Sequence, residues 1–479
     1  MTPALSAGSV AAVDLGATSG RVILGQFADG HLRLRHLARF ANEPVRIGDG
    51  LHWNILELYR QLLMGLAAAE REASGEIRSI GIDSWAVDYG LLRGGRLLGV
   101  PYHYRDSRNE AGVAAVHAKI HPAELYRRNG VQHLNFNTVF QLASEGELLG
   151  FADRLLLIPD LLNHWLTGAE VAERSNASTT GLYDPRSQEW DLGLATRLGI
   201  PSSILPPLVN AGSPLGVLQP EAAAAVGRAL DVVTVGSHDT ASAVVAIPNP
   251  GRDFAYISCG TWGLVGLELD APVISDQARA ANFTNEGGVD GRVRFLHNVM
   301  GLWLLSESLH SWAPVSTAEQ RSSLLQELLQ QAAKLEGPVA LFEVNDPVFL
   351  PPGDIPSRIA EWCRTHGEPV PQNPAQFVRT IVQSLGAAFA RAVHDAARLA
   401  DHEVSVIHLV GGGVHNALLC QATADHSGLP VLAGPVEATA IGNVLIQARS
   451  TGLVSGDLAE LRSLVASEFP VIRYEPREV

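Results

Sequence analysis

The chain has 479 residues, which is too many for one hydrophobic core, so we expect two domains. Hydrophobic residues make up 46% and charged residues 18%, an ordinary balance for a globular protein, and no apolar stretch is long enough to span a membrane. The net charge of −15 argues against nucleic acid or anionic lipid as a partner. Because this charge would also repel a nucleotide, any bound phosphate must be held by local N–H groups and a metal ion.

Cysteine and lysine usage excludes further classes of protein. Cys259, Cys363 and Cys420 form no CxxC pair, which fits a reducing cytoplasm and excludes a disulfide framework or a cysteine zinc site. The N-terminal stretch MTPALSAGSV has neither a basic region nor an apolar run, so we expect no signal peptide. Lysine occurs only as Lys119 and Lys334, in neither a GxxxxGK[ST] loop nor a VAIK-like strand, which excludes P-loop and protein-kinase sites.

The first half begins with strands. Residues 9–40 predict three strands joined by a Gly- and hydroxyl-rich turn, GATSGR, and by a hairpin turn, ADG. Residues 53–73 carry leucines at helical spacing and predict an amphipathic helix. Residues 77–92 return to strand, which gives the order β-β-β-α-β.

An acid stands at a later strand-to-helix turn. Residues 231–235 predict a buried strand and residues 240–246 the start of a helix, with Asp239 between them. This position lies at the sheet edge where α/β proteins usually bind ligands. Asp is also a preferred helix cap, and on local grounds capping is the more common role of such a residue. The segment alone leaves both roles open.

The second half begins like the first. Residues 247–251, IPNPG, predict a linker. Residues 253–270 predict a strand, a Gly-containing turn with Thr, and a second strand, the same order as in VDLGATSGRVIL. This repeat predicts two similar domains facing one cleft, which we place at 1–248 and 249–479.

Three later features complete the pattern. Asn373 and Pro374 form a cap and first-turn pair for a long helix. Residues 404–410 predict a strand that leads through glycines 411–413 into a helix, and residues 437–448 predict another helix. The glycines form either a tight turn or a place where backbone N–H groups approach a ligand closely.

The whole pattern resembles the FGGY carbohydrate kinases, and within them the rhamnulokinase branch, over nearly the full chain. The motifs that carry the resemblance are VDLGATSGRV (13–22), GIDSWAVDYGLL (81–92), YRDSR (104–108), FNTVFQL (136–142), NASTTGLYD (176–184), SHDTASAV (237–244), GTWGLVG (260–266), NFTNEGGVDG (282–291), NVMGLWLL (298–305) and VGGGVHNALLCQ (410–421). DLG and GGG alone indicate only the sugar kinase–actin–Hsp70 superfamily. The block 282–305 and SHDTASAV are typical of the rhamnulokinase branch.

The resemblance implies an α/β fold with two ribonuclease H-like domains facing a central cleft. It implies ATP-dependent phosphorylation of L-rhamnulose at its terminal hydroxyl, in L-rhamnose catabolism, with ATP and Mg²⁺. The N-terminal domain would bind the sugar and carry the phosphate loop and the base, and the C-terminal domain would bind the nucleotide. A cytoplasmic monomer or dimer that acts on a small ketose, without nucleic acid or membrane partners, is expected.

Individual site residues follow from matching positions. The implied nucleotide contacts are Ala17, Thr18, Ser19, Gly20, Arg21, Thr261, Asn298 and Gly412. The implied sugar contacts are the backbone of Ala86, in the SWA turn, and His238, Asp239 and Thr240. Asp239 would accept the proton of the attacking hydroxyl. Asp14, at the end of the first strand, can hold Mg²⁺ through water, and Trp85 either lines the sugar pocket or belongs to the core.

Three residues depart from the family pattern. Ala86 stands where rhamnulokinases commonly have Gly, so the approach of the backbone to the sugar is in doubt. Ser306 stands where the family often has Gln, and Leu162 replaces the Lys of a P-x-x-K-x-x-W stretch. We therefore expect no nucleotide contact from Ser306 or Leu162.

Other functions remain open from sequence. A non-catalytic actin-like ATPase would share the hairpins and GGG but would not need a base aimed at a second substrate. A metal phosphohydrolase of the HD type is prompted by His238-Asp239 and His394-Asp395, but that fold is helical and the first pair follows a strand. A kinase for another ketose, such as L-fuculose, L-xylulose or D-xylulose, would differ in a few contacts.

Overall fold

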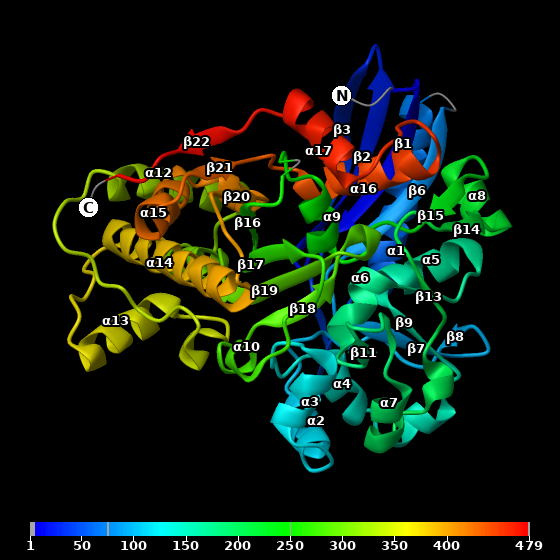
Figure 1. The fold of residues 1–479 in the computed structure, drawn as a ribbon, viewed down its shortest axis with the longest axis horizontal. Coiled ribbons are helices and arrows are strands. Elements are labelled where there is room, and N and C mark those ends of the chain that lie inside the picture. Colours follow the sequence, from blue (N-terminus) through cyan, green and yellow to red (C-terminus); the bar gives the residue numbers. More distant parts are fainter. Residues whose placement is uncertain (1–4, 74–75, 250, 478–479) are drawn as a thin grey trace. The chain divides into compact units, whose positions relative to one another are not determined.

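The computed structural model describes residues 5–73, 76–249 and 251–477. The chain forms two compact units, coloured along the sequence in Figure 1. The first unit consists of Met1–Pro250, Glu268–Phe295 and Glu437–Glu468, and the second of Gly251–Leu267, Leu296–Val436 and Phe469–Val479. Pro250 of the predicted linker and the first four residues of the N-terminal stretch lie outside the described residues. The functional division at 248/249 stays a prediction.

The sheet of the first unit contains the three strands predicted near the N-terminus. Within the described residues, its strands lie in the order β14-β15-β6-β1-β2-β3. They are β1 (Gly8–Leu15), β2 (Ser19–Ala28), β3 (His31–Ala41), β6 (Ile77–Ser84), β14 (Pro214–Val217) and β15 (Asp231–Val233). Strands β1, β6 and β15 run parallel to one another, whereas β2 is antiparallel to β1. The three strands predicted over 9–40 are confirmed.

The sheet of the second half repeats this order. Its described strands lie in the order β22-β21-β20-β16-β17-β19-β18. They are β16 (Phe254–Cys259), β17 (Trp262–Leu269), β18 (Thr284–Gly287), β19 (Val293–Met300), β20 (Val406–Val410), β21 (Val431–Ala433) and β22 (Ile472–Tyr474). Like β1, β16 has an antiparallel partner on one side, β17, and two successive parallel strands on the other, β20 and β21. The predicted internal repeat is confirmed as a repeat of topology.

The remaining strands are short. They are β4 (Val45–Ile47), β5 (Gly50–His52), β7 (Tyr89–Arg93), β8 (Arg96–Leu97), β9 (Arg154–Leu157), β10 (Ala172–Glu173), β11 (Tyr183–Asp184), β12 (Glu189–Trp190) and β13 (Leu208–Val209). The strand predicted over 77–92 is therefore divided into β6 and β7. The break between them contains the SWA turn and the residue after it, Val87, whose φ of 69° lies outside the strand region.

Helices surround both sheets. Those of the first unit are α1 (Ile55–Ala73), α2 (Asn109–His117), α3 (Pro122–Asn129), α4 (Thr138–Ala143), α5 (Ile158–Thr167), α6 (Arg174–Ala177), α7 (Leu192–Leu198), α8 (Pro220–Val226), α9 (Asp239–Val245), α10 (Asp276–Ala280), α16 (Ala438–Ser450) and α17 (Leu458–Glu468). Those of the second are α11 (Trp303–Trp312), α12 (Ala318–Ala332), α13 (Ile355–His366), α14 (Pro374–Ala400) and α15 (Ala417–Ser427). Among the described helices, none combines the length and apolarity that a membrane crossing requires.

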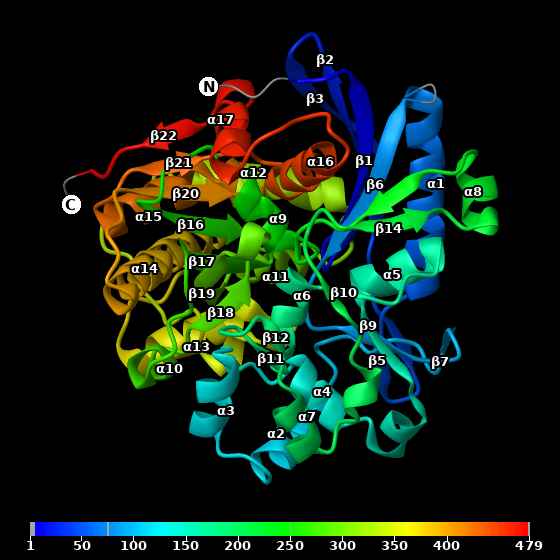
Figure 2. The same cartoon turned by 45° about the vertical axis from the view of Figure 1, so that its right-hand side comes forward.

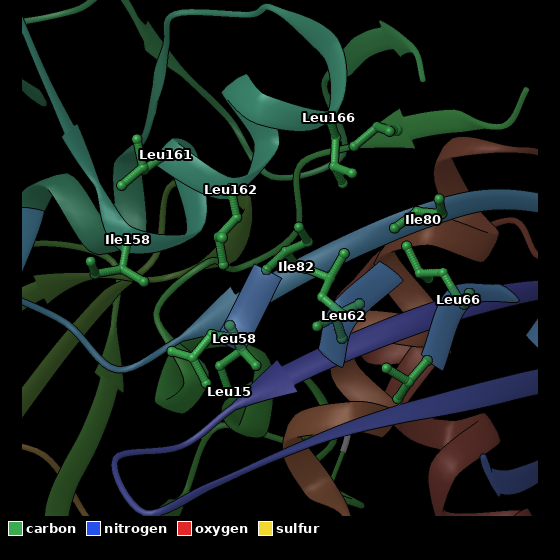
Figure 3. Close-up of a cluster of buried hydrophobic side chains, with 14 of the residues drawn as sticks. Leu15, Leu58, Leu62, Leu66, Ile80, Ile82, Ile158, Leu161, Leu162 and Leu166 are labelled. Carbon is green, nitrogen blue, oxygen red and sulfur yellow. The ribbon is translucent and has the colours of Figure 1, made fainter. Parts of the chain in front are cut away.

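The core of the first unit lies between α1 and one face of the sheet. Leucines 58, 62 and 66 of α1 face β1 and β6, together with leucines of α5 (Figure 3). Leu162 of α5 is fully buried in this cluster. The leucine that stands in place of the family's Lys is therefore a core residue. The predicted amphipathic helix is confirmed, with its apolar stripe on the sheet.

The opposite face of the same sheet is covered by α16, which comes from near the C-terminus (Figure 2). Its Gln447 side chain donates a hydrogen bond to the carbonyl oxygen of Ala11 in β1, at 3.1 Å. Helix α16 also packs against α9 at Gly442, where a β-carbon would collide with the carbonyl oxygen of Ser242. A glycine is needed here because the two helix backbones touch. The first unit is thus closed by a segment remote in sequence.

Candidate active site

The carboxyl ends of three adjacent parallel strands, β1, β6 and β15, lie at one edge of the first sheet. Asp14 of β1 pairs in register with Asp83 of β6, so these acids lie side by side. The N–H of Ser84 donates to the carbonyl oxygen of Ser237, at 2.9 Å, which joins the end of β6 to the loop after β15. The edge of a parallel sheet is the usual ligand site of α/β proteins.

Burial and mutual repulsion disturb the acids at this edge. Burial raises the pKa of Asp14 to about 6; the charge of Arg21 opposes this shift and that of Asp239 adds to it. Burial and the charge of Asp14 raise the pKa of Asp83 well above its usual range, against a hydrogen bond of 2.6 Å from the Asn443 side chain. The negative charges of Asp14, Asp83 and Asp239 therefore oppose one another, and Asp14 and Asp83 are buried.

The turn after β1 is closed by backbone contacts. The N–H of Gly16 donates to the carbonyl oxygen of Ser19, at 2.9 Å, and Thr18 at the tip is exposed. Arg21 donates from Nε to Asp14, at 2.9 Å, and forms an ion pair of 2.6 Å with Glu437. Ala17, also in this turn, is partly buried.

Gly20 has a packing reason of its own. A β-carbon at this position would collide with the ring of Phe40. A glycine is therefore required here by the protein itself, whether or not the backbone also meets a phosphate.

Asp239 is the first residue of α9 and the most exposed acid of the three. Its side chain is 30% exposed, against 4% for that of Asp14, and Asp83 is fully buried. The residue before the helix is His238, and no side-chain capping hydrogen bond forms there. The Thr240 hydroxyl donates to the Asp239 carboxylate at 3.1 Å. The geometry therefore gives no support to capping as the role of Asp239.

A buried glutamate holds the loop that leads to Asp239. Glu173, 1% exposed, accepts hydrogen bonds of 3.0 Å from both the N–H and the hydroxyl of Ser237, and others from Ser175. Burial raises the pKa of Glu173, and these donors oppose the rise. β15 ends at Val233, two residues earlier than predicted, and the chain then passes into this loop.

His238 is surrounded by charged side chains. Its Nδ1 lies 3.0 Å from Nη2 of Arg294 and 3.2 Å from Oε2 of Glu286, and its Nε2 lies 3.5 Å from Oδ1 of Asp239. Burial alone would raise the pKa of Glu286, but the contacts with His238 and Arg294 hold it below its usual value. All four side chains belong to the first unit.

The SWA turn sits on a second buried acid. Trp85 is 6% exposed, packs with its ring centroid 4.0 Å from that of Trp53, and donates to Asp88 at 3.0 Å. Trp85 is therefore a core tryptophan. Asp88 also accepts from Trp53 at 2.6 Å and from Gln141 at 2.8 Å, and burial raises its pKa to about 7 against the pull of these donors. Ala86 is partly exposed in the turn above.

Two predicted nucleotide residues lie near each other within the second unit. Thr261 is in the turn between β16 and β17, and Gly412 follows β20, the parallel neighbour of β16. A β-carbon on Gly412 would lie 3.8 Å from the carbonyl oxygen of Cys259, two residues before Thr261. Asn298 lies on β19, the neighbour of β17, and Ser306 is exposed on α11.

The sequence does not single out four buried charged residues that lie beside Asp14 or contact the His238 loop: Asp83, Glu173, Glu286 and Arg294. Asp83 has a detectable signal, because GIDS repeats the pattern of AVDL at the end of a strand expected to run beside β1. The other three act on the His238 loop from remote segments. No local pattern predicts such contacts, because they depend on tertiary packing.

Comparison with known proteins identifies the fold. Residues 9–246 match the N-terminal domain of the FGGY family of carbohydrate kinases, and residues 255–451 match its C-terminal domain. A curated rhamnulokinase of Bacteroides thetaiotaomicron is 40% identical over 474 residues, covering 98% of this chain and 96% of the relative. One of Pectobacterium atrosepticum is 41% identical over 476 residues, covering 98% and 93%.

Solved structures agree with this at the level of fold. The structure of a xylulose kinase from Lactobacillus acidophilus has a TM-score of 0.76 at 15% identity, covering 98% of this chain and 94% of that one. Plasmodium falciparum glycerol kinase has a TM-score of 0.74 at 14% identity, with the same coverage. The two-domain α/β kinase fold expected from the motifs is confirmed. The chain belongs to the FGGY family of carbohydrate kinases.

Proposed function

We propose that the protein transfers the γ-phosphoryl group of ATP to the terminal hydroxyl of L-rhamnulose, giving L-rhamnulose 1-phosphate. The observation that carries this proposal is the identity of about 40% to curated rhamnulokinases over 98% of the chain. Membership of a sugar-kinase family supports the reaction class and ATP as the phosphoryl donor. The reaction would take place in the cytoplasm, with the enzyme a monomer or dimer.

Asp239 is the proposed general base. Phosphoryl transfer to an alcohol needs an acceptor for the hydroxyl proton, placed where the sugar can reach it. Asp239 combines a strand-edge position with the most exposed carboxylate of the cluster, which supports that role. The proposed sugar contacts are His238, Thr240 and the backbone of Ala86. His238 and Thr240 are the neighbours of Asp239 in the chain, and a β-bridge joins His238 to Ser84 of the SWA turn within the first unit.

Asp14 is proposed to hold Mg²⁺ through water, with Asp83 beside it. Carboxylate oxygens are preferred ligands of this ion. Asp83 Oδ1 is buried without a hydrogen-bond partner among the described residues. Burial is the main cause of the raised pKa of both acids, and the repulsion between neighbouring acids, which a cation would relieve, adds to it. In the same residues, no three acidic, His or Cys side chains are grouped closely enough to hold a metal directly. When bound, Mg²⁺ would neutralise charge on the phosphates.

The proposed nucleotide contacts form two sets, one in the segment assigned at 1–248 and one in the segment assigned at 249–479. The first set is the phosphate loop: Ala17, Thr18, Ser19, Gly20 and Arg21. The second set is Thr261, Asn298 and Gly412. The exposure of Thr18 and Gly412 on turns that follow strands supports these assignments.

Gly412→Val is expected to weaken ATP binding by about 10- to 100-fold, which corresponds to an overpacking cost of about 1–3 kcal/mol. Of the three glycines, only Gly412 allows a clean test. A β-carbon there makes ordinary contacts, whereas at Gly413 it would meet the Cys259 sulfur at 2.5 Å, and Gly411 has a φ of 82°. Calorimetric titration with ATP, with ketose binding to the free enzyme as the control, measures the effect. Unchanged ATP affinity in a folded variant would remove Gly412 from the site.

A panel of ketoses tests the proposed function. ADP release would be followed with L-rhamnulose, L-fuculose, L-xylulose and D-xylulose, and without sugar. We expect the highest kcat/KM with L-rhamnulose and very slow ATP hydrolysis in the absence of sugar. A higher kcat/KM with another ketose would assign that sugar as the substrate and leave the reaction class unchanged. Rapid ATP hydrolysis that no ketose stimulates would favour the ATPase alternative.

A further inference from the structure

The block 282–305, typical of the rhamnulokinase branch, contains two buried charged residues that the proposed mechanism does not use. Glu286 lies on β18 and Arg294 on β19, and both are buried, Arg294 completely. Arg294 donates from Nε to the carbonyl oxygen of Gly287, at 2.9 Å, and its Nη2 lies 3.1 Å from Oε2 of Glu286. The same Nη2 is 3.0 Å from Nδ1 of His238. These contacts all lie within the first unit.

The contact with Arg294 determines which nitrogen of His238 carries the proton. A guanidinium group has only donors, so Nδ1 of His238 must be the acceptor in this hydrogen bond. The proton of the neutral imidazole is then on Nε2. Glu286 Oε2 also lies near Nδ1, at 3.2 Å, but the same oxygen is 3.1 Å from Nη2 of Arg294, which has two hydrogens and can donate one to each acceptor.

The other nitrogen is the one that faces the proposed base. Nε2 of His238 lies 3.5 Å from Oδ1 of Asp239. With a proton on Nε2, the ring presents a donor to this carboxylate and to a sugar hydroxyl that approaches both side chains. With the opposite tautomer, a lone pair would face the carboxylate, which is repulsive, and the donor would be lost.

We propose that Arg294 is a positioning residue that holds His238 as its Nε2–H tautomer beside Asp239, with Glu286 balancing the buried charge of Arg294. Glu286 alone would have the opposite effect, because a carboxylate beside Nδ1 attracts a proton to that atom. Arg294 is therefore the group that decides the tautomer. The catalytic consequence rests on the proposed function, whereas the tautomer does not.

Nitrogen NMR of the protein labelled with ¹⁵N-histidine tests the tautomer without any substrate. The sequence has 17 histidines, so His238 would be assigned by the signal lost in His238→Gln. In mildly alkaline buffer we expect the wild-type His238 signals of an Nε2–H imidazole. A proton on Nδ1 in the wild type would overturn the proposal, even if no Arg294 variant folds.

Arg294→Met tests whether Arg294 is the cause. We expect His238 to gain a proton on Nδ1, opposite Glu286, as the other tautomer or as imidazolium. Arg462→Met is the matched control, because Arg462 is also buried and pairs with a glutamate, Glu268, at 2.8 and 2.9 Å. Arg462 also donates to the carbonyl oxygen of Val244 at 3.0 Å, and among the described residues it forms no hydrogen bond with His238. This control should lower stability and leave the His238 signals unchanged. An unchanged His238 spectrum in Arg294→Met would refute the assignment.

Kinetics test the catalytic consequence. Arg294→Met is expected to lower kcat by about 10- to 100-fold, the usual cost of losing a residue that orients a functional histidine, with a smaller change in the KM for the ketose. Arg462→Met should show neither change. A wild-type kcat in a variant whose tautomer has changed would contradict the positioning role. The predicted tautomer in a protein that phosphorylates no ketose would instead refute the proposed function alone.

Discussion

Asp239→Asn is expected to lower kcat with L-rhamnulose by ~10²–10⁴-fold, the usual contribution of a general base. The amide keeps the size of the side chain and its acceptor oxygen, so the hydrogen bond from Thr240 can remain. It cannot take up the hydroxyl proton. Because Asp239 is partly exposed and no capping bond forms at its helix, the substitution should cost little stability. Steady-state kinetics with thermal unfolding measures both effects.

The exposed Asp231 of β15 provides a matched control for this variant. Asp231→Asn removes the same charge from the strand that leads to the site but lies at its far end. We expect wild-type kinetics for it. If Asp239→Asn retained near-normal turnover while folded, Asp239 would not be the base, and the reaction would need another proton acceptor.

Asp88→Asn is expected to flatten the pH dependence of stability between about pH 4 and pH 7. In the folded protein burial raises the pKa of Asp88 from 3.8 to about 7. Over this range the unfolded chain releases the proton while the folded protein keeps it. The contribution of Asp88 to the free energy of unfolding is therefore complete below its unfolded pKa of 3.8 and is lost as the pH rises to its folded pKa of about 7. The loss is about 4 kcal/mol for a shift of about 3 pKa units. Asn has no proton to release.

Denaturant titrations of both proteins across this pH range would measure the effect. Other buried acids also titrate, so the informative quantity is the difference between the two unfolding free energies at each pH. That difference should shift in favour of Asp88→Asn as the pH rises. Parallel curves would mean that Asp88 is ionised in both states and that its two indole donors stabilise the charge fully.

Much of the fold could be predicted from local sequence features such as caps, turns and apolar spacing. The cap at Asn373 is present, with its side chain accepting from the N–H of Gln376 at 3.1 Å, and α14 begins at Pro374. The helix predicted at 437–448 is α16, and the strand before the glycines is β20. Such features succeed because caps, turns and amphipathic periods depend on neighbours in the sequence.

The candidate site was predicted only in part, for a physical reason. Asp14 and Asp239 stand at strand ends, which local patterns can locate. The contacts of Glu173 with Ser237 and of Arg294 with His238 join segments about 60 residues apart. Nor does any periodicity show that 268–295 and 437–468 join the first unit. The partners of a buried charged residue depend on tertiary packing, and a single sequence gives the residue types but not the way they pack.

The closure of the first unit by α16 also bears on how the protein is made. A nascent chain that has left the ribosome as far as residue 250 already holds β1, β6 and α9, but the face that α16 covers is bare. The unit can be completed only after residue 450, when almost the whole polypeptide has been synthesised. Until then, Gly25 and Gly81, which contact Val444 and Asn443 of α16 in the finished protein, would lie open on a sheet able to aggregate. Chaperone demand should therefore peak late in translation rather than after the first half.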